Sequence, residues 1–209
     1  MPRTLAVAVL ASGRGSNFEA LAKACRRAGF PASIELLITD NPSAGAIGVA
    51  SSMDIPFVVV DCGPKRGSMS PDSSAAMTRV CEEHGIGLVC LAGFMRIVKG
   101  EIMQRYAGRM LNIHPALLPS FKGLDGQKQA LEYGVRYTGC TVHFVDEGVD
   151  TGPIVTQRVV PVRQDDDVER LSARILAEEH IAYSEAVRLF AEGRLRFEGR
   201  KVIVSDESK

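Results

Sequence analysis

An amide and an imidazole stand two residues apart in the apolar stretch at 110–123, which reads MLNIHPALLPSFKG. In an extended chain successive side chains alternate, so Asn112 and His114 would share one face of a strand. Pro115 cannot extend a hydrogen-bonded ladder and biases His114 toward extended geometry. An amide donates hydrogen bonds without titrating, whereas histidine titrates near neutral pH. The pair therefore suits acyl transfer, with a developing oxyanion and a proton transfer, or else a capped strand end whose histidine bonds to backbone.

A cluster of acidic residues follows the strand expected at Cys140–Val145, in the loop sequence VHFVDEGVDTGP. A carboxylate of this loop placed beside His114 would raise the pKa of the imidazole and orient the ring. Asp146, Glu147 and Asp150 are the carboxylates of this loop that could make that contact. Most acidic loops are simply solvated or form Asx turns, and this alternative stays open.

The histidines offer no pattern for a metal. His143 alternates with Val142 and Phe144, which predicts that it faces away from the core and has a structural role. None of the histidines stands in a short-range ligand motif such as HExxH. We therefore expect a protein without a metal.

A glycine-rich turn connects an apolar run to a helical pattern in the sequence LAVAVLASGRGSNFEAL. Glycines let the backbone approach an anion, and the N–H groups at a helix start favour phosphate. Ser16 and Asn17 follow Gly15 and would add side-chain donors there. A dinucleotide fingerprint needs a third glycine where Phe18 stands, so a single phosphate fits better than a pyrophosphate, although Asp40 could imitate the ribose-binding acid. The alternative is a tight turn with Ser16 or Asn17 as N-cap.

Short buried strands and helices alternate through the first half of the chain, which predicts an α/β fold with a mostly parallel sheet and helices on both faces. The expected strands are Leu5–Ala11, Ile34–Thr39, Phe57–Val60, Ile86–Ala92 and Met110–Ile113. The expected helices are Asn17–Ala28, Ala44–Met53, Ser73–His84 and Gly100–Tyr106. The second half is expected to hold a helix near Gln127–Glu132, strands at Cys140–Val145 and Ile154–Val162, a long helix ending at Gly193 and a terminal hairpin around Glu198–Gly199.

Composition and length narrow the class of protein further. The 209 residues are expected to form a single domain, residues 1–209, with a Rossmann-like half to about 108 and a second half from about 109. The 25 basic and 25 acidic side chains give a formal charge of zero, which does not favour nucleic acid or a membrane surface as partner. Five widely spaced cysteines predict reduced thiols and a cytoplasmic protein. The apolar run near the N-terminus is too short to span a bilayer.

Four segments together resemble one known family. They read GRGSN at 13–17, LAGFMRIV at 91–98, LNIHPALLPSFKGLDG at 111–126 and GCTVHFVDEGVDTGPIV at 139–155. In these segments the chain resembles the folate-dependent phosphoribosylglycinamide formyltransferases of purine biosynthesis. The resemblance implies a formyltransferase fold and an enzyme that moves the formyl group of 10-formyltetrahydrofolate to the glycine amine of glycinamide ribonucleotide, without metal.

The resemblance also implies roles for individual residues. It implies that the catalytic residues are Asn112, His114 and Asp150, with Asp150 keeping His114 protonated. It implies that the ribonucleotide binds at Gly15, Ser16, Asn17 and Glu179, so that the phosphate loop holds a monophosphate. It implies that the folate binds at Met95, Arg96, Ile97, Val98, Asn112, Val145 and Asp146. Without the resemblance, the segment at 95–98 would read as core and Glu179 as a solvated helix face.

Two positions depart from what many members of this family carry. Ser70 stands where many have an arginine that contacts the folate, and Arg66 or Lys65 could substitute for it. Gln127 stands where members often have histidine. The loops Cys62–Pro71 and Pro115–Gly126 are the candidates for closing on substrate, because Gly and Pro punctuate long irregular segments there.

Four other functions compete with this expectation. One is an NAD-dependent oxidoreductase, which Phe18 in place of the third glycine does not favour. A formyltetrahydrofolate deformylase shares the catalytic trio but carries an additional N-terminal domain, for which we expect no room before Leu5. Methionyl-tRNA formyltransferase adds a C-terminal domain for the tRNA, and zero formal charge does not favour a tRNA partner. A non-catalytic nucleotide-binding protein would be expected to lose part of the trio. The expected partners are thus small molecules, with a monomer or a homodimer both open.

Overall fold

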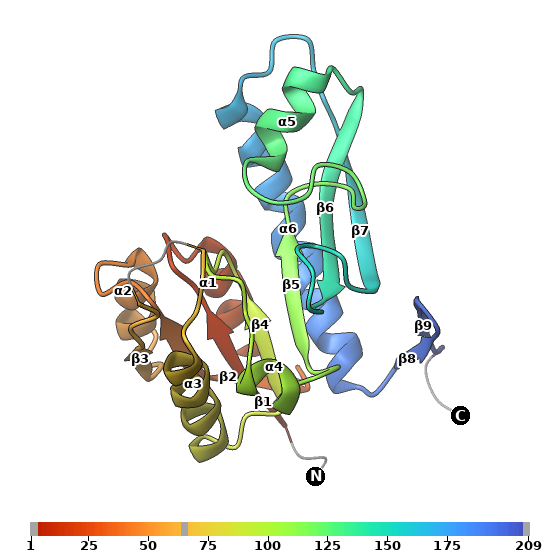
Figure 1. Cartoon of the computed structure of the whole chain (residues 1–209). Coiled ribbons are helices and arrows are strands. Elements are labelled where there is room, and N and C mark those ends of the chain that lie inside the picture. Colours follow the sequence, from red (N-terminus) through yellow and green to blue (C-terminus); the bar gives the residue numbers. More distant parts are fainter. Residues whose placement is uncertain (1–3, 64–66, 207–209) are drawn as a thin grey trace. The chain divides into compact units, whose positions relative to one another are not determined.

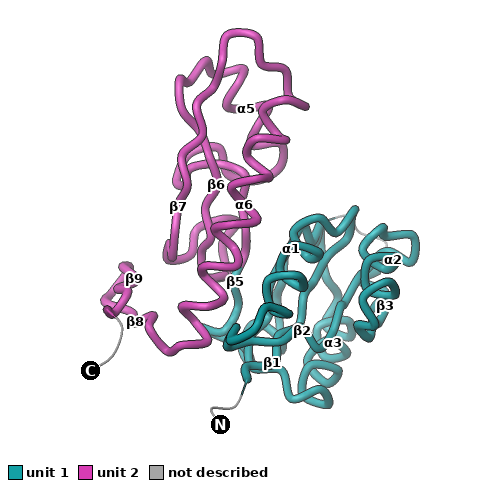
Figure 2. The backbone as a smooth tube through the Cα atoms, turned by 180° about the vertical axis from the view of Figure 1, so that it is seen from behind, with its two compact units in different colours: residues 1–111 teal, residues 112–209 magenta. Residues whose placement is uncertain are grey.

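The computed structural model describes residues 4–63 and 67–206, so Lys65 and Arg66 lie outside the described residues. The chain forms two compact units, residues 1–111 and residues 112–209, which Figure 2 colours separately. Each unit is described below by itself.

A parallel sheet forms the centre of the first unit (Figure 1), with the strand order β3-β2-β1-β4. Its strands are β1 (Leu5–Leu10), β2 (Ala32–Thr39), β3 (Phe57–Val59) and β4 (Leu88–Leu91). The last four residues of β1 are completely buried, as expected for a strand covered on both faces. The helices are α1 (Ser16–Cys25), α2 (Gly45–Ser52), α3 (Pro71–Glu83) and α4 (Glu101–Arg105). Helices α1 and α2 pack against β2 and each other, and α3 packs against α4.

The order in which strands are added to this parallel sheet reverses between β1 and β4. From β1 the chain proceeds to β2 and β3 on one side, and then returns to β4 on the other side of β1. In open α/β sheets the loops that follow the strands at such a switch point usually bind the ligand. The loops after β1 and β4 contact each other, because the Ser12 N–H donates to the Gly93 carbonyl at 3.1 Å. They are the glycine-rich turn and the segment that leads to Met95–Val98.

The second unit is built on an antiparallel strand pair and one long helix. Strand β5 (Met110–His114) leads into this unit and neighbours β6 (Tyr137–Phe144), which pairs antiparallel with β7 (Ile154–Pro161). Helix α6 (Val168–Ala191) packs on both β6 and β7, and α5 (Gly126–Tyr133) packs against α6. Asp167 caps α6 by accepting from the Arg170 N–H at 2.8 Å. A separate hairpin of β8 (Leu195–Glu198) and β9 (Lys201–Val204) follows.

The predicted fold class is confirmed, and each expected strand and helix is present with ends that differ by no more than three residues. The terminal hairpin is present around Glu198–Gly199 as predicted. The largest differences are at α1, which ends at Cys25 rather than at Ala28, and at β6, which begins at Tyr137 rather than at Cys140. The three additional residues of β6 pair with the far end of β7, from Val159 to Pro161, so pairing rather than local apolar content sets the start of β6.

The thiols are reduced and mostly buried. The cysteines at 62, 81, 90 and 140 are buried, Cys25 is half-buried, and all five are free. Burial raises the pKa values of the Cys25, Cys81 and Cys140 thiols to about 12.

Candidate active site

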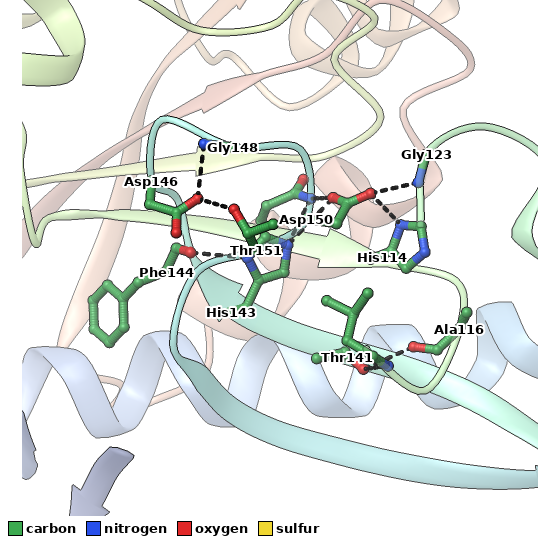
Figure 3. Close-up of polar contacts among 12 residues, drawn as sticks. His114, Ala116, Gly123, Thr141, His143, Phe144, Asp146, Gly148, Asp150 and Thr151 are labelled. Atoms are coloured by element: carbon green, nitrogen blue, oxygen red, sulfur yellow. Dashed lines mark hydrogen bonds and ion pairs between the residues drawn. The ribbon is translucent and has the colours of Figure 1, made fainter. Parts of the chain in front are cut away.

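Four polar side chains of the second unit converge at the ends of β5 and β6 (Figure 3). Strand β5 contributes Asn112 and His114, which share one face as the alternation predicts. Strand β6 contributes His143, and the loop after β6 contributes Asp150. The structure therefore brings the predicted trio together and adds one residue to it.

The loop from Val145 to Pro153 is closed at its base, which fixes the backbone around Asp150. The Phe144 N–H donates to the Pro153 carbonyl at 2.8 Å, and a Cβ on Gly152 would collide with the Phe144 carbonyl oxygen. Asp150 adopts a left-handed backbone with φ 51°, which Asp tolerates better than most residues. The loop thus turns the Asp150 carboxylate back toward the strand ends.

Asp146 stabilises this loop from within. Its Oδ1 accepts from the Gly148 N–H at 3.1 Å and from the Thr151 hydroxyl at 2.6 Å (Figure 3). This is an Asx-type turn, which was the alternative for an acidic loop. The side chain of Asp146 therefore stabilises the loop. A ligand contact at this position would be left to its main chain.

The carboxylate of Asp150 is shared among four donors or rings. Oδ2 lies 3.2 Å from His114 Nδ1 and accepts from the Gly123 N–H at 2.8 Å. Oδ1 accepts from Asn112 Nδ2 at 3.3 Å and lies 3.5 Å from His143 Nε2. Burial acts to raise the pKa of Asp150, but the contacts with His143, Gly123 and His114 outweigh it and hold the pKa below its usual range. Asp150 is therefore an anion at neutral pH.

His114 is 3% exposed, and acceptors face both of its ring nitrogens. Nε2 lies 2.8 Å from the Phe121 carbonyl oxygen, and Nδ1 faces Asp150. Only the protonated ring donates to both acceptors. Burial nevertheless lowers the pKa of His114 below its ordinary value, against the opposing effects of Asp150 and the Phe121 carbonyl. Burial therefore opposes the charged ring, while acceptors for a proton on each ring nitrogen are already in place.

The prediction for His143 was wrong. The ring is 2% exposed and lies on the same side as the trio, with Nε2 3.1 Å from Asn112 Nδ2. Strand β6 is buried along both faces from Thr138 to Phe144, so alternation with apolar neighbours did not imply an outward face. Thr141, two residues earlier on the same face of β6, donates to the Ala116 carbonyl in the loop after β5. The sequence carries no sign of this contact.

The predicted phosphate loop begins α1 in the first unit. Gly15 has φ 84° and caps the helix, and a Cβ there would lie 2.8 Å from the Ala46 Cα. Glycine is thus required both by the backbone conformation and by the close approach of α2. Ser16 and Asn17 form the first turn of α1, where N–H groups and the helix dipole favour an anion.

Arg96 of the predicted folate segment is engaged inside the first unit. Its Nε donates to Asp40 Oδ2 at 2.6 Å, and its Nη1 donates to the Gly63 and Ser68 carbonyls at 3.3 Å each. Ser12 donates to Asp40 Oδ1 at 2.5 Å and accepts from the Met95 N–H at 2.9 Å. This network links the loops after β1, β2 and β4. It also shows that Asp40 is an internal anchor in this structure.

The neighbours of Arg96 differ in exposure. Met95 is 55% exposed, Ile97 is 38% exposed and Val98 is buried, so the plain-core alternative fails for the first two. Ser70 caps α3 by accepting from the Ser73 N–H at 3.1 Å.

Glu179 is buried on α6, with 6% of its surface exposed, so the alternative of a solvated helix face is wrong. It continues the buried stripe of Leu171 and Ile175, with Ala182 next along the same face. That spacing was visible in the sequence. An acid at a core position of an amphipathic helix is a stronger functional signal than an acid on its polar face.

Within residues 4–63 and 67–206, no group of three or more His, Cys, Asp or Glu side chains is placed to hold a metal ion. None of the helices in that part of the chain has the length and apolar content needed to cross a membrane.

Comparisons with known proteins identify the family of the chain and match its fold. Residues 5–187 match the family model described as Formyl transferase. The chain is 45% identical over 190 residues to the trifunctional purine biosynthetic protein adenosine-3 of Homo sapiens, covering 91% of this chain and 19% of that protein. It is 39% identical over 181 residues to the phosphoribosylglycinamide formyltransferase of Bacillus subtilis (strain 168), covering 87% and 92%. The crystal structure of glycinamide ribonucleotide transformylase 1 from Symbiobacterium toebii matches with a TM-score of 0.91 and 44% identity, covering 97% and 95%. The chain thus spans about a fifth of the length of the trifunctional relative.

Proposed function

Because the chain belongs to the formyl transferase family, we propose that it transfers the formyl group of 10-formyltetrahydrofolate to the glycine amine of glycinamide ribonucleotide. The products are N-formylglycinamide ribonucleotide and tetrahydrofolate, in de novo purine biosynthesis. The observation that carries the proposal is the contact of one carboxylate, Asp150, with both Asn112 and His114. The names of relatives in purine biosynthesis support the choice of substrates.

In the first step the amine nitrogen attacks the formyl carbon, and the formyl oxygen takes up negative charge. The Asn112 amide stabilises that oxygen by a hydrogen bond, and the protonated His114 ring stabilises it by its positive charge. In the free protein one Asn112 N–H is held by Asp150 at 3.3 Å, a long bond that a charged oxygen would replace. The developing charge also favours the proton on His114, and its Phe121 and Asp150 partners then accept from both nitrogens.

In the second step the attacking nitrogen loses a proton, the folate nitrogen gains one, and the bond between that nitrogen and the formyl carbon breaks. Asp150 is an anion in contact with both Asn112 and His114, and we propose that it guides this proton, through a water where the distance requires one. Its second role is to favour the protonated form of His114 against the effect of burial.

We propose that the first unit binds the phosphate and the second unit performs the chemistry. Gly15, Ser16 and Asn17 would hold the monophosphate, since they offer backbone and side-chain donors at a helix start. Glu179, a buried acid, would bind the ribonucleotide. The folate would contact the main chain and exposed side chains at Met95–Val98, and the main chain of Val145–Asp146. Because the Arg96 guanidinium is engaged by Asp40, Arg96 would contribute its backbone.

The test follows loss of the formyl group from 10-formyltetrahydrofolate by absorbance, with and without glycinamide ribonucleotide. We expect turnover only with the ribonucleotide, and its collapse in His114→Ala and Asp150→Ala. Asn112→Ala should lower kcat by about 10²–10³-fold, or about 2.7–4 kcal/mol, because it removes one oxyanion donor. His84→Ala, an exposed histidine of the first unit, is the matched control and should keep full activity.

Each rival function has its own outcome in this assay. Formyl release that does not need the ribonucleotide would make the protein a deformylase, in which water takes the formyl group. Absence of turnover in both tubes would leave a non-catalytic nucleotide-binding protein and refute the proposal.

A further inference from the structure

His143 lies against the trio but has no place in the transfer steps described above. Its Nδ1 lies 2.8 Å from the Phe144 carbonyl oxygen and its Nε2 lies 3.1 Å from Asn112 Nδ2 (Figure 3 shows the contact with Phe144). The ring is buried between these contacts. A buried histidine with a hydrogen-bond partner at each ring nitrogen restricts which atoms its neighbours can turn toward it.

The two contacts define one protonation state of the ring. A carbonyl oxygen only accepts hydrogen bonds, so the proton of His143 stands on Nδ1. Nε2 has two neighbours, the Asn112 amide nitrogen at 3.1 Å and Asp150 Oδ1 at 3.5 Å. The closer one, the amide nitrogen, only donates, so Nε2 of His143 presents its lone pair to it. The neutral ring with the proton on Nδ1 is the form that satisfies both partners. It makes His143 a fixed acceptor at the base of the site.

A fixed acceptor determines which way the Asn112 amide points. With Nδ2 toward His143, the second N–H of the same nitrogen reaches Asp150 Oδ1 at 3.3 Å. A flipped amide would place its carbonyl oxygen against the His143 lone pair and the Asp150 carboxylate, which repel it. The amide therefore presents its N–H, rather than its oxygen, on the side of Asp150 and His114.

We propose that His143 is a positioning residue that holds the Asn112 amide with its nitrogen toward the reacting oxygen. Resting on the proposed function, this assigns the oxyanion donor to a pair of residues, of which only Asn112 touches the substrate. His143 contributes orientation, and its effect passes entirely through Asn112.

A double-mutant cycle tests this dependence. His143→Phe keeps a ring of similar size and removes the acceptor, and we expect kcat to fall by about 10–100-fold with little change in KM, as for a donor misplaced in the transition state. In the Asn112→Ala background the same change should cost little more. If kcat of the double variant falls by the product of the two single-variant losses, the two residues act independently and the proposal is overturned. His143→Gln, which keeps an acceptor, should recover part of kcat.

A measurement independent of turnover complements the cycle. Two-bond ¹H–¹⁵N correlation spectra should show the His143 ring neutral, with Nδ1 protonated and Nε2 unprotonated, and this form should persist in Asn112→Ala because Phe144 still accepts from Nδ1. A ring protonated on Nε2 would overturn the proposal even if both variants lose activity or fail to fold. If the wild type shows no formyl transfer, the proposed function fails, and the spectra still decide the state of His143.

Discussion

At the scale of single residues, one carboxylate coordinates the site. Asp150 contacts Asn112, His114, His143 and the Gly123 N–H, so four groups depend on the position of a single side chain. His114 depends on it most, because burial opposes the protonated ring and Asp150 favours it. This balance has a consequence for stability that can be measured without substrate.

We expect the free energy of unfolding to fall as the pH drops below about 6.5. The pKa of His114 is lower in the folded protein than in the unfolded chain, so the unfolded chain binds more protons between the two values, and acid favours unfolding there. Asp150, whose pKa is held low, loses its contribution only at lower pH, as its own folded pKa is reached. Urea denaturation at pH 5.5, 6.5 and 7.5 gives the free energy of unfolding at each pH. This free energy should change less steeply with pH in His114→Phe than in the wild type. Equal slopes would contradict the lowered pKa.

The residues alone predicted the Asn112–His114 pair, the family resemblance singled out Asp150, and neither pointed to His143. The Asn112–His114 spacing and the acidic loop were local patterns, and strand alternation placed the pair on one face. His143 was misplaced because alternation identifies an outward face only where one side of a strand meets water. Strand β6 is buried on both sides, which depends on the loop after β5 and on α6 rather than on the strand itself.

At the scale of elements, the terminal hairpin supports the loop that carries Asp150. Arg200, in the turn between β8 and β9, donates to the Thr151 carbonyl at 2.6 Å, and the Phe197 ring centroid lies 4.7 Å from that of Phe144. These contacts reach both ends of the loop. The family model ends at residue 187, before the hairpin begins.

We expect Arg200→Ala to lower kcat/KM several-fold, because the Asp150 loop loses a contact that restrains its end. The melting temperature should change little, since exposed substitutions usually alter stability by about 0.5 kcal/mol or less. Arg196→Ala is the matched control, because Arg196 lies on the same hairpin and its guanidinium pairs with Glu198 at 3.5 Å. Equal kinetics for the two variants would show that the hairpin does not support the loop.

Element types were predictable because apolar periodicity of 2 and 3.6 residues is a local property of the chain. Loop geometry was not, because it depends on contacts distant in sequence. Phe121 and Asp150 both adopt positive φ, at 54° and 51°, although neither residue type requires it. Their conformations are held by His114, which bonds the Phe121 carbonyl, and by Gly123, which bonds the Asp150 carboxylate.

At the scale of the whole molecule, binding should be visible as stabilisation. We expect glycinamide ribonucleotide and a non-reactive 10-formyl folate analogue each to raise the melting temperature, because a ligand of the native state adds about 2.7 kcal/mol at 100 times its Kd. NAD should have no effect, since Phe18 replaces the glycine that a pyrophosphate needs. Differential scanning fluorimetry with each ligand separately checks this. Stabilisation by NAD alone would contradict the assignment of the glycine-rich turn to a monophosphate.

Because its thiols are mostly buried, the native chain should react little with thiol-directed labels. Thiolates are the reactive form, and pKa values of about 12 at Cys25, Cys81 and Cys140 leave almost none at neutral pH. Burial also raises the pKa of Cys62, and Cys90 is shielded in β4. A cysteine introduced at Val149, which is 47% exposed beside Asp150, would therefore accept a maleimide fluorophore ahead of the native thiols. Such a reporter would let a stopped-flow instrument follow the Asp150 loop in real time.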